Sequence, residues 1–84
     1  MEIDNWNQTA VKVLLADAQS ALALTQAEEI RGAVAVEVVA AARANYIDLV
    51  RRSNVLIMTN GDLIAFQRML DHLRACLRFF GESV

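Results

Sequence analysis

Large apolar side chains recur every three or four residues through the last third of the chain. Six of them share this spacing: Leu63, Phe66, Leu70, Leu73, Leu77 and Phe80. The spacing places them along one side of an α-helix in a seven-residue repeat, the pattern of a packed helical seam. Thr59 with Asp62 three residues later predicts a capped start, and Gly81 predicts the end of the helix. The pattern therefore predicts a helix over residues 60–80, which needs a groove of the same chain, a second copy or a partner to pack against.

A second helical stripe runs through the first third of the chain. Its apolar positions are Val11, Leu14, Leu15, Ala18 and Leu22.

The start and end of this first helix depend on short polar signals. Asp4 or Asn5 can cap its start. Thr25 with Glu28 forms a capping box that would begin a new helix, whereas Gly32 offers a later end for the first one. One long bent helix is a third possibility. We expect a break between residues 24 and 32, with a first helix over about residues 5–24.

The middle segment is the most apolar part of the chain. Its alanine-rich sequence favours a helix over about residues 26–58. Glu37, Asp48, Arg51 and Arg52 fall on one narrow polar side at 100° per residue, so the remaining circumference predicts packing on two sides. An unbroken helix of this length would overhang its neighbours and expose apolar surface unless a second protomer covered it. Ser53 with Asn54 is the point where the helix could end early and leave residues 55–58 as a connection.

These patterns predict an all-α fold. We expect a single domain over residues 1–84, a small three-helix bundle with a long central helix, completed by dimerisation. Composition favours the same assembly, because 56% of the residues are hydrophobic although a chain of 84 residues has proportionally more surface to keep polar.

Composition and charge also limit the function. One cysteine excludes an internal disulfide framework, and acids near the N-terminus are unlike an export signal, so a reducing cytoplasm is expected. Asp17 and Glu37 interrupt the longest apolar runs, so no membrane span is expected. A pI of about 5.2 disfavours nucleic acid. The Gly-containing turn at residues 58–62 still keeps a helix-turn-helix regulator as an alternative.

Candidate chemistry is sparse. His72 and Cys76 lie four residues apart and would share one side of a helix, as an imidazole-activated thiolate requires. No third orienting group accompanies them, and two ligands are too few for a metal site. We therefore expect no catalytic residues, no metal and no cofactor. A small dimeric enzyme that holds an anionic substrate through Arg31, Arg43 or Arg51 is a second alternative.

The preferred interpretation is a small non-enzymatic interaction module, such as an adaptor, a chaperone-like protein or an inhibitor. Its expected partners are a second copy of the chain and another protein, bound through an apolar helical surface. Arg43 lies within the apolar arc of the middle helix, either as a rim residue with its head in water or as a charged anchor for a partner. The candidate contact residues are Leu63, Phe66, Met69, Leu70, Leu73, Leu77, Phe79 and Arg43.

Overall fold

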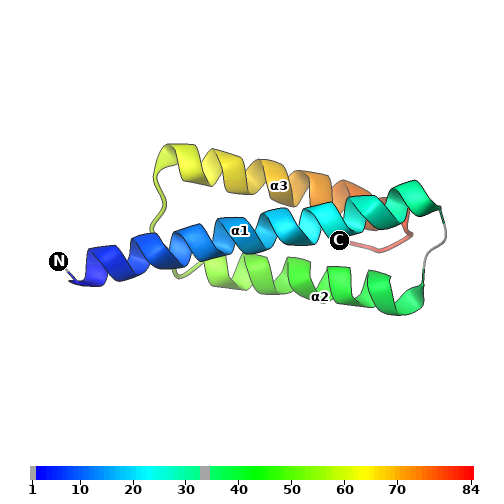
Figure 1. Ribbon diagram of the computed structural model, residues 1–84, viewed down its shortest axis with the longest axis horizontal. Coiled ribbons are helices and arrows are strands. Elements are labelled where there is room, and N and C mark those ends of the chain that lie inside the picture. The colour runs from blue at the N-terminus through cyan, green and yellow to red at the C-terminus, as the bar shows by residue number, and fades with distance from the viewer. Residues whose placement is uncertain (1, 33–34) are drawn as a thin grey trace.

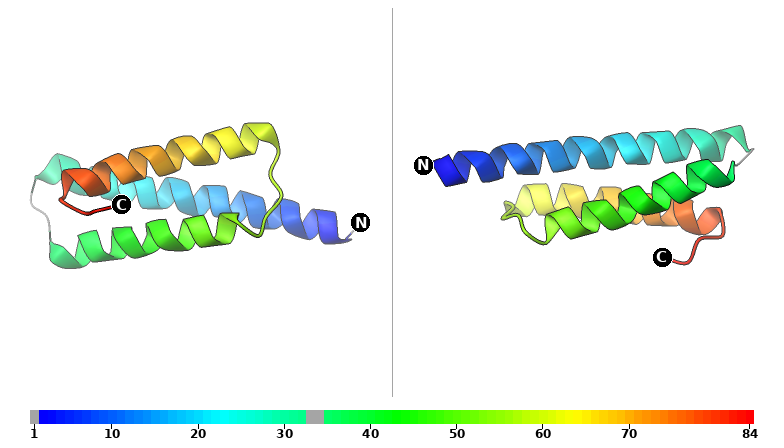
Figure 2. Two further views of the ribbon diagram at one scale, coloured as in Figure 1. Left: turned by 180° about the vertical axis from the view of Figure 1, so that it is seen from behind. Right: turned by 90° about the horizontal axis from the view of Figure 1, so that it is seen from below.

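Three helices make up the computed structural model, which describes residues 2–32 and 35–84, with side chains from Trp6 onward. They are α1 (Glu2–Arg31), α2 (Val36–Ser53) and α3 (Asn60–Phe79), and the described residues contain no strand. Successive helices run in opposite directions along the bundle (Figure 1). The first turns of α1 project beyond the connection between α2 and α3. Viewed from below, α2 and α3 lie on the same side of α1 (Figure 2). The predicted all-α, three-helix architecture is confirmed.

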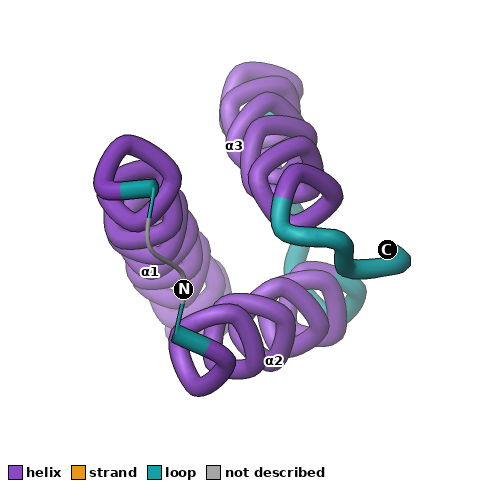
Figure 3. The backbone as a smooth tube through the Cα atoms, turned by 90° about the vertical axis from the view of Figure 1, so that its right-hand side faces the viewer, coloured by secondary structure: helices purple, strands orange, loops and turns teal. Residues whose placement is uncertain are grey.

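The core lies between the three helices, which form the corners of a triangle when seen end-on (Figure 3). Its buried members are Leu14, Ala18 and Ala21 from α1, Ala42 and Leu49 from α2, and Phe66, Leu73 and Leu77 from α3. Leu14 and Ala18 belong to the predicted stripe, and Ala21 lies beside its last member, Leu22. Two of the three α1 members are alanines, and small side chains allow neighbouring helices to approach closely.

Helix α1 is longer than expected at both ends. It already includes Asp4 and Asn5, the two predicted caps. The expected break after Leu24 is wrong, because the helix continues through Thr25. The Thr25 hydroxyl is buried and donates to the Ala21 carbonyl of the preceding turn at 2.7 Å, so it does not cap a new helix. The alternative end is confirmed: Gly32 has φ 71°, and its N–H donates to the Glu28 carbonyl at 3.2 Å.

Helix α2 is shorter than the predicted span of residues 26–58, of which residues 33 and 34 lie outside the described residues. It ends at Ser53, so the early end weighed from the sequence is the one that occurs. The following connection is held against α1, because the Asn7 amide donates to the Ile57 carbonyl at 2.6 Å and accepts from the Ile57 N–H at 3.1 Å. The longest helix is therefore α1, and a central-helix overhang no longer argues for a dimer.

Both ends of α3 are capped as predicted. The Thr59 hydroxyl oxygen accepts a hydrogen bond from the Asp62 N–H at 3.2 Å. At the other end Gly81 has φ 89°, and the N–H groups of Gly81 and Glu82 donate to the carbonyls of Arg78 and Leu77, each at 2.9 Å. This pair of bonds is a Schellman motif, which requires a left-handed residue at the glycine.

Two glycines at opposite ends of α3 should respond to alanine in opposite directions. Gly81→Ala forces a side chain into the left-handed region and should lower the free energy of unfolding by about 1–2 kcal/mol. Gly61→Ala is the matched control, because Gly61 is helical and a new Cβ would lie 4.0 Å from the Thr59 hydroxyl oxygen. It should raise stability by up to about 1 kcal/mol. Urea unfolding followed by circular dichroism measures the stability of both variants. A stability change of the same sign in the two variants would contradict the left-handed cap at Gly81 and the helical conformation of Gly61.

Candidate functional site

Three of the contact residues predicted on α3 lie in the protein's own core. Phe66, Leu73 and Leu77 are 2%, 1% and 0% exposed, in one cluster with buried residues of α1 and α2. A partner cannot contact these side chains while the helices stay packed. The prediction that they bind a partner is corrected, because the chain itself supplies the groove that the α3 seam needs.

The other predicted contact residues do not gather in one place. Met69 and Leu70 are partly buried and pack against the core. Leu63 and Phe79 are exposed, but they lie near opposite ends of α3. Arg43 is half-exposed on α2, with its Nε atom 3.8 Å from a Glu82 carboxylate oxygen. Its pairing within the chain fits a rim residue with its charged head in water.

An open groove runs between α1 and α2. It consists of three adjoining hollows of about 360, 230 and 330 Å³. Arg52 lines both the first and the second hollow, and Leu24 and Asn45 line both the second and the third. The groove, here called the α1/α2 groove, therefore extends from Trp6 near the start of α1 to Glu28 near its end.

Each wall of the groove includes a line of residues spaced three or four apart. The α1 wall contains Trp6, Ala10, Val13, Asp17, Ser20 and Leu24, and the α2 side contains Val38, Ala41, Asn45, Asp48, Arg52 and Val55 just beyond the helix end. This is the spacing of a packed helical seam, but these two lines face outward beside a core that is already filled.

Exposed apolar side chains line both ends of the groove, although the far end also carries Glu28 and Glu37. Trp6 and Val55 are 74% and 81% exposed at one end, and Leu24 is 67% exposed toward the other. Ala10 and Val13 continue the first end, where the groove has little polar lining. Apolar side chains gathered along one groove, rather than scattered singly, mark an interaction surface.

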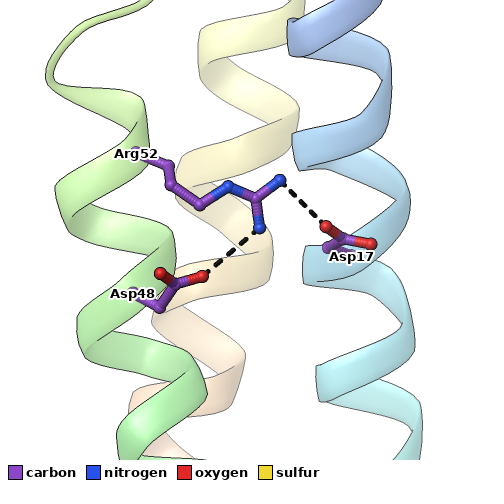
Figure 4. Close-up of polar contacts among 3 residues, drawn as sticks. All are labelled: Asp17, Asp48 and Arg52. Atoms are coloured by element: carbon purple, nitrogen blue, oxygen red, sulfur yellow. Dashed lines mark hydrogen bonds and ion pairs between the residues drawn. The ribbon is translucent and has the colours of Figure 1, made fainter.

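The centre of the groove is polar. Arg52 reaches across from α2, with one terminal nitrogen 2.9 Å from Asp17 on α1 and the other 3.3 Å from Asp48 (Figure 4). The hydrogen bond to Asp17 raises the pKa of Arg52 above its ordinary value, and that to Asp48 adds to the rise. One guanidinium thus serves two carboxylates, and the cluster carries a net charge of −1.

Sequence reasoning missed this groove because its lines are not uniformly apolar. Asp17 and Ser20 fall outside the inward apolar stripe of the first helix, and Asp48 and Arg52 belong to the narrow polar side of the middle helix. The signal lay in the seven-residue repeat of mixed positions, such as Trp6, Val13 and Ser20 on α1. A search for apolar periodicity alone does not find these lines, because the residues at their centre are polar.

The candidate pair of Cys76 thiol and His72 imidazole, which was not expected to be catalytic, is not activated in the structure. Cys76 is buried, and its thiol donates to a Glu29 carboxylate oxygen at 3.1 Å. Burial, with the hydrogen bond and negative charge of Glu29, raises the pKa of Cys76 to about 11. His72 lies on the exposed side of α3. The thiol stays protonated at neutral pH, which is the opposite of what nucleophilic catalysis requires.

The arginines of the enzyme alternative do not converge. Arg31 pairs with Glu28 at 3.1 Å, Arg43 faces Glu82, and Arg51 is exposed near the end of α2. None of them lines the three hollows of the groove. Within the described residues, no group of three His, Cys, Asp or Glu side chains is placed to hold a metal ion.

The helix-turn-helix alternative gains no support either. Helices α2 and α3 run in opposite directions along the bundle, whereas that motif sets its two helices at a steep angle (Figure 1). In the part of the chain that is described, no helix has the length and apolar character to cross a bilayer.

Comparison of the chain with protein-family models, with curated proteins and with solved structures finds no significant match.

Proposed function

We propose that this protein is a non-enzymatic interaction module that binds an amphipathic helix of another protein in the α1/α2 groove. The observation that carries this proposal is the pair of outward lines at seam spacing beside a core completed by the chain itself. Such lines offer holes into which the apolar side chains of another helix insert. Docking of a helix in an apolar groove is a recurring mode of recognition, and it would here produce a four-helix bundle.

The expected homodimer is a separate proposal. Its support is the apolar surface that remains outside the groove, including Ile64 and Phe79 on α3 and Ile47 on α2. Light scattering of the wild type measures whether the protein forms a dimer. The same measurement on a variant substituted in the α1/α2 groove shows whether self-association uses the groove.

The test of groove binding is selection from a display library of helical peptides, with apolar residues fixed at the outer seam positions, and with the central seam positions and all other positions randomised. Ala41→Trp places a ring in the groove, at an exposed position where the fold should tolerate it. Ala40→Trp adds the same ring to the adjacent exposed residue, which does not line the groove, and is the matched control.

We expect selected helices to bind the wild type and Ala40→Trp with similar Kd. Ala41→Trp should bind them roughly tenfold more weakly or worse, since tenfold corresponds to only about 1.4 kcal/mol. Failure to select any helix, or binding that survives Ala41→Trp, would contradict the proposed function.

A further inference from the structure

We infer that the centre of the α1/α2 groove selects a partner helix with an arginine or lysine at the position facing Asp17, Asp48 and Arg52. The inference rests on the proposed function and names the chemistry of the helix that the groove accepts.

The central cluster is short of one positive charge. Arg52 reaches the Oδ2 atom of Asp17 and the Oδ2 atom of Asp48. Among the described residues, no donor contacts the Oδ1 atom of either carboxylate, and both side chains are about half exposed (50% and 56%). A cation on the docked helix would bring the cluster to neutrality and donate to these free oxygens. Arginine suits the site best, because its planar fork donates to two acceptors at once.

The rest of the groove favours a basic helix as well. Glu28 lines the far hollow and is balanced by Arg31 at 3.1 Å. Glu37 lines the same hollow, and no ion pair within the described residues involves it. The four groove carboxylates are thus accompanied by two arginines, a net charge of −2, and a partner with cations near its apolar side would complement this charge.

Symmetry disfavours a second copy of the chain as the occupant. A two-fold dimer formed through this groove would place one central cluster opposite the other, because the cluster lies midway along the groove. Two clusters of net charge −1 would then face each other with less water between them, and like charges across an interface oppose association. A foreign helix with a central cation avoids this repulsion.

The charged centre also fixes the register of the docked helix against the apolar contacts on either side of it. The apolar ends alone would allow the helix to slide by one or two turns with little loss of contact. A cation that must face Asp17 and Asp48 permits one position only, as a single polar residue does in a coiled-coil seam.

The experiment reads the sequences of the helices selected against the wild-type protein. We expect lysine or arginine to be enriched at one central seam position. When that residue is changed to alanine in a selected peptide, binding to the wild type should weaken about tenfold, as for a charge-assisted hydrogen bond. With Asp48→Asn, which makes the cluster neutral, the same change should have little effect. Glu37→Gln removes a carboxylate elsewhere in the groove and should keep the full tenfold preference.

The outcomes separate this inference from the proposed function. Helices that bind in an Ala41-dependent way but show no central preference for a cation would overturn the inference and leave the proposed function standing. A central preference unchanged by Asp48→Asn would overturn it too. Absence of any Ala41-dependent binder would overturn both. Self-association of the wild type that Ala41→Trp abolishes would identify a second copy as the occupant and contradict the inference.

Discussion

Replacing Phe66 with alanine is expected to lower the free energy of unfolding by about 3–5 kcal/mol. The ring is 2% exposed in the cluster that joins all three helices, so its removal leaves a cavity that the small core cannot close. A loss of this size is a large part of the roughly 5–15 kcal/mol by which a domain is stable. Urea unfolding followed by circular dichroism measures the change.

The matched control is Ile64→Ala on the same helix, where the side chain is 53% exposed. Its effect on stability should be within about 0.5 kcal/mol. If Phe66→Ala instead kept wild-type stability and lost only the binding of a selected helix, then the α3 seam would be the contact surface and the core assignment would be wrong.

The second large effect is the protection of the Cys76 thiol. With a folded-state pKa of about 11 against 9.0 for a free thiol, the thiolate fraction at pH 8 is about 100-fold smaller in the folded protein. Alkylation by iodoacetamide at pH 8 should be slower by about this factor in the folded protein than in urea. An equal rate would show that the thiol is not held by Glu29 in the core.

The same shift predicts how stability depends on pH. The pKa is raised in the folded state, so the folded protein keeps the thiol proton after the unfolded chain has lost it. The resulting stabilisation is complete below about pH 9 and is lost as the pH rises through about 11, a change on the order of 2 kcal/mol. Cys76→Ala should lack this component, while all other groups that titrate in the range are common to both proteins. If the free energy of unfolding changed with pH in the same way for the wild type and Cys76→Ala, the prediction would be refuted.

The ends of α3 could be predicted from the sequence because local chemistry decides them. Thr59 precedes an apolar run and caps the start of the helix there. Gly81 follows the last turn, where the helix ends in a left-handed residue. The end of α1 could not be predicted in this way. Thr25 can either cap a new helix or bond back to Ala21, and both uses look alike in sequence. Burial of Thr25 against the rest of the bundle selects the second.

The candidate binding surface likewise could be predicted only in part from the sequence. The seam of α3 has the spacing of an interaction surface, and the sequence alone does not say whether the chain or a partner fills it. The chain fills it with residues such as Leu14 and Ala18 of α1. The α1/α2 groove depends on two helices lying side by side, and its centre joins Asp17 to Arg52, far apart in the sequence. Only the packed structure brings these groups together.

The most direct test of the groove is chemical-shift mapping by NMR on ¹⁵N-labelled wild-type protein titrated with the tightest selected helix. We expect the largest changes at amides along the two walls, around Ser20 and Leu24 on α1 and Ala41 and Asn45 on α2. Changes confined instead to α3, around Leu63 and Phe79, would contradict the groove and return the contact surface to the last helix.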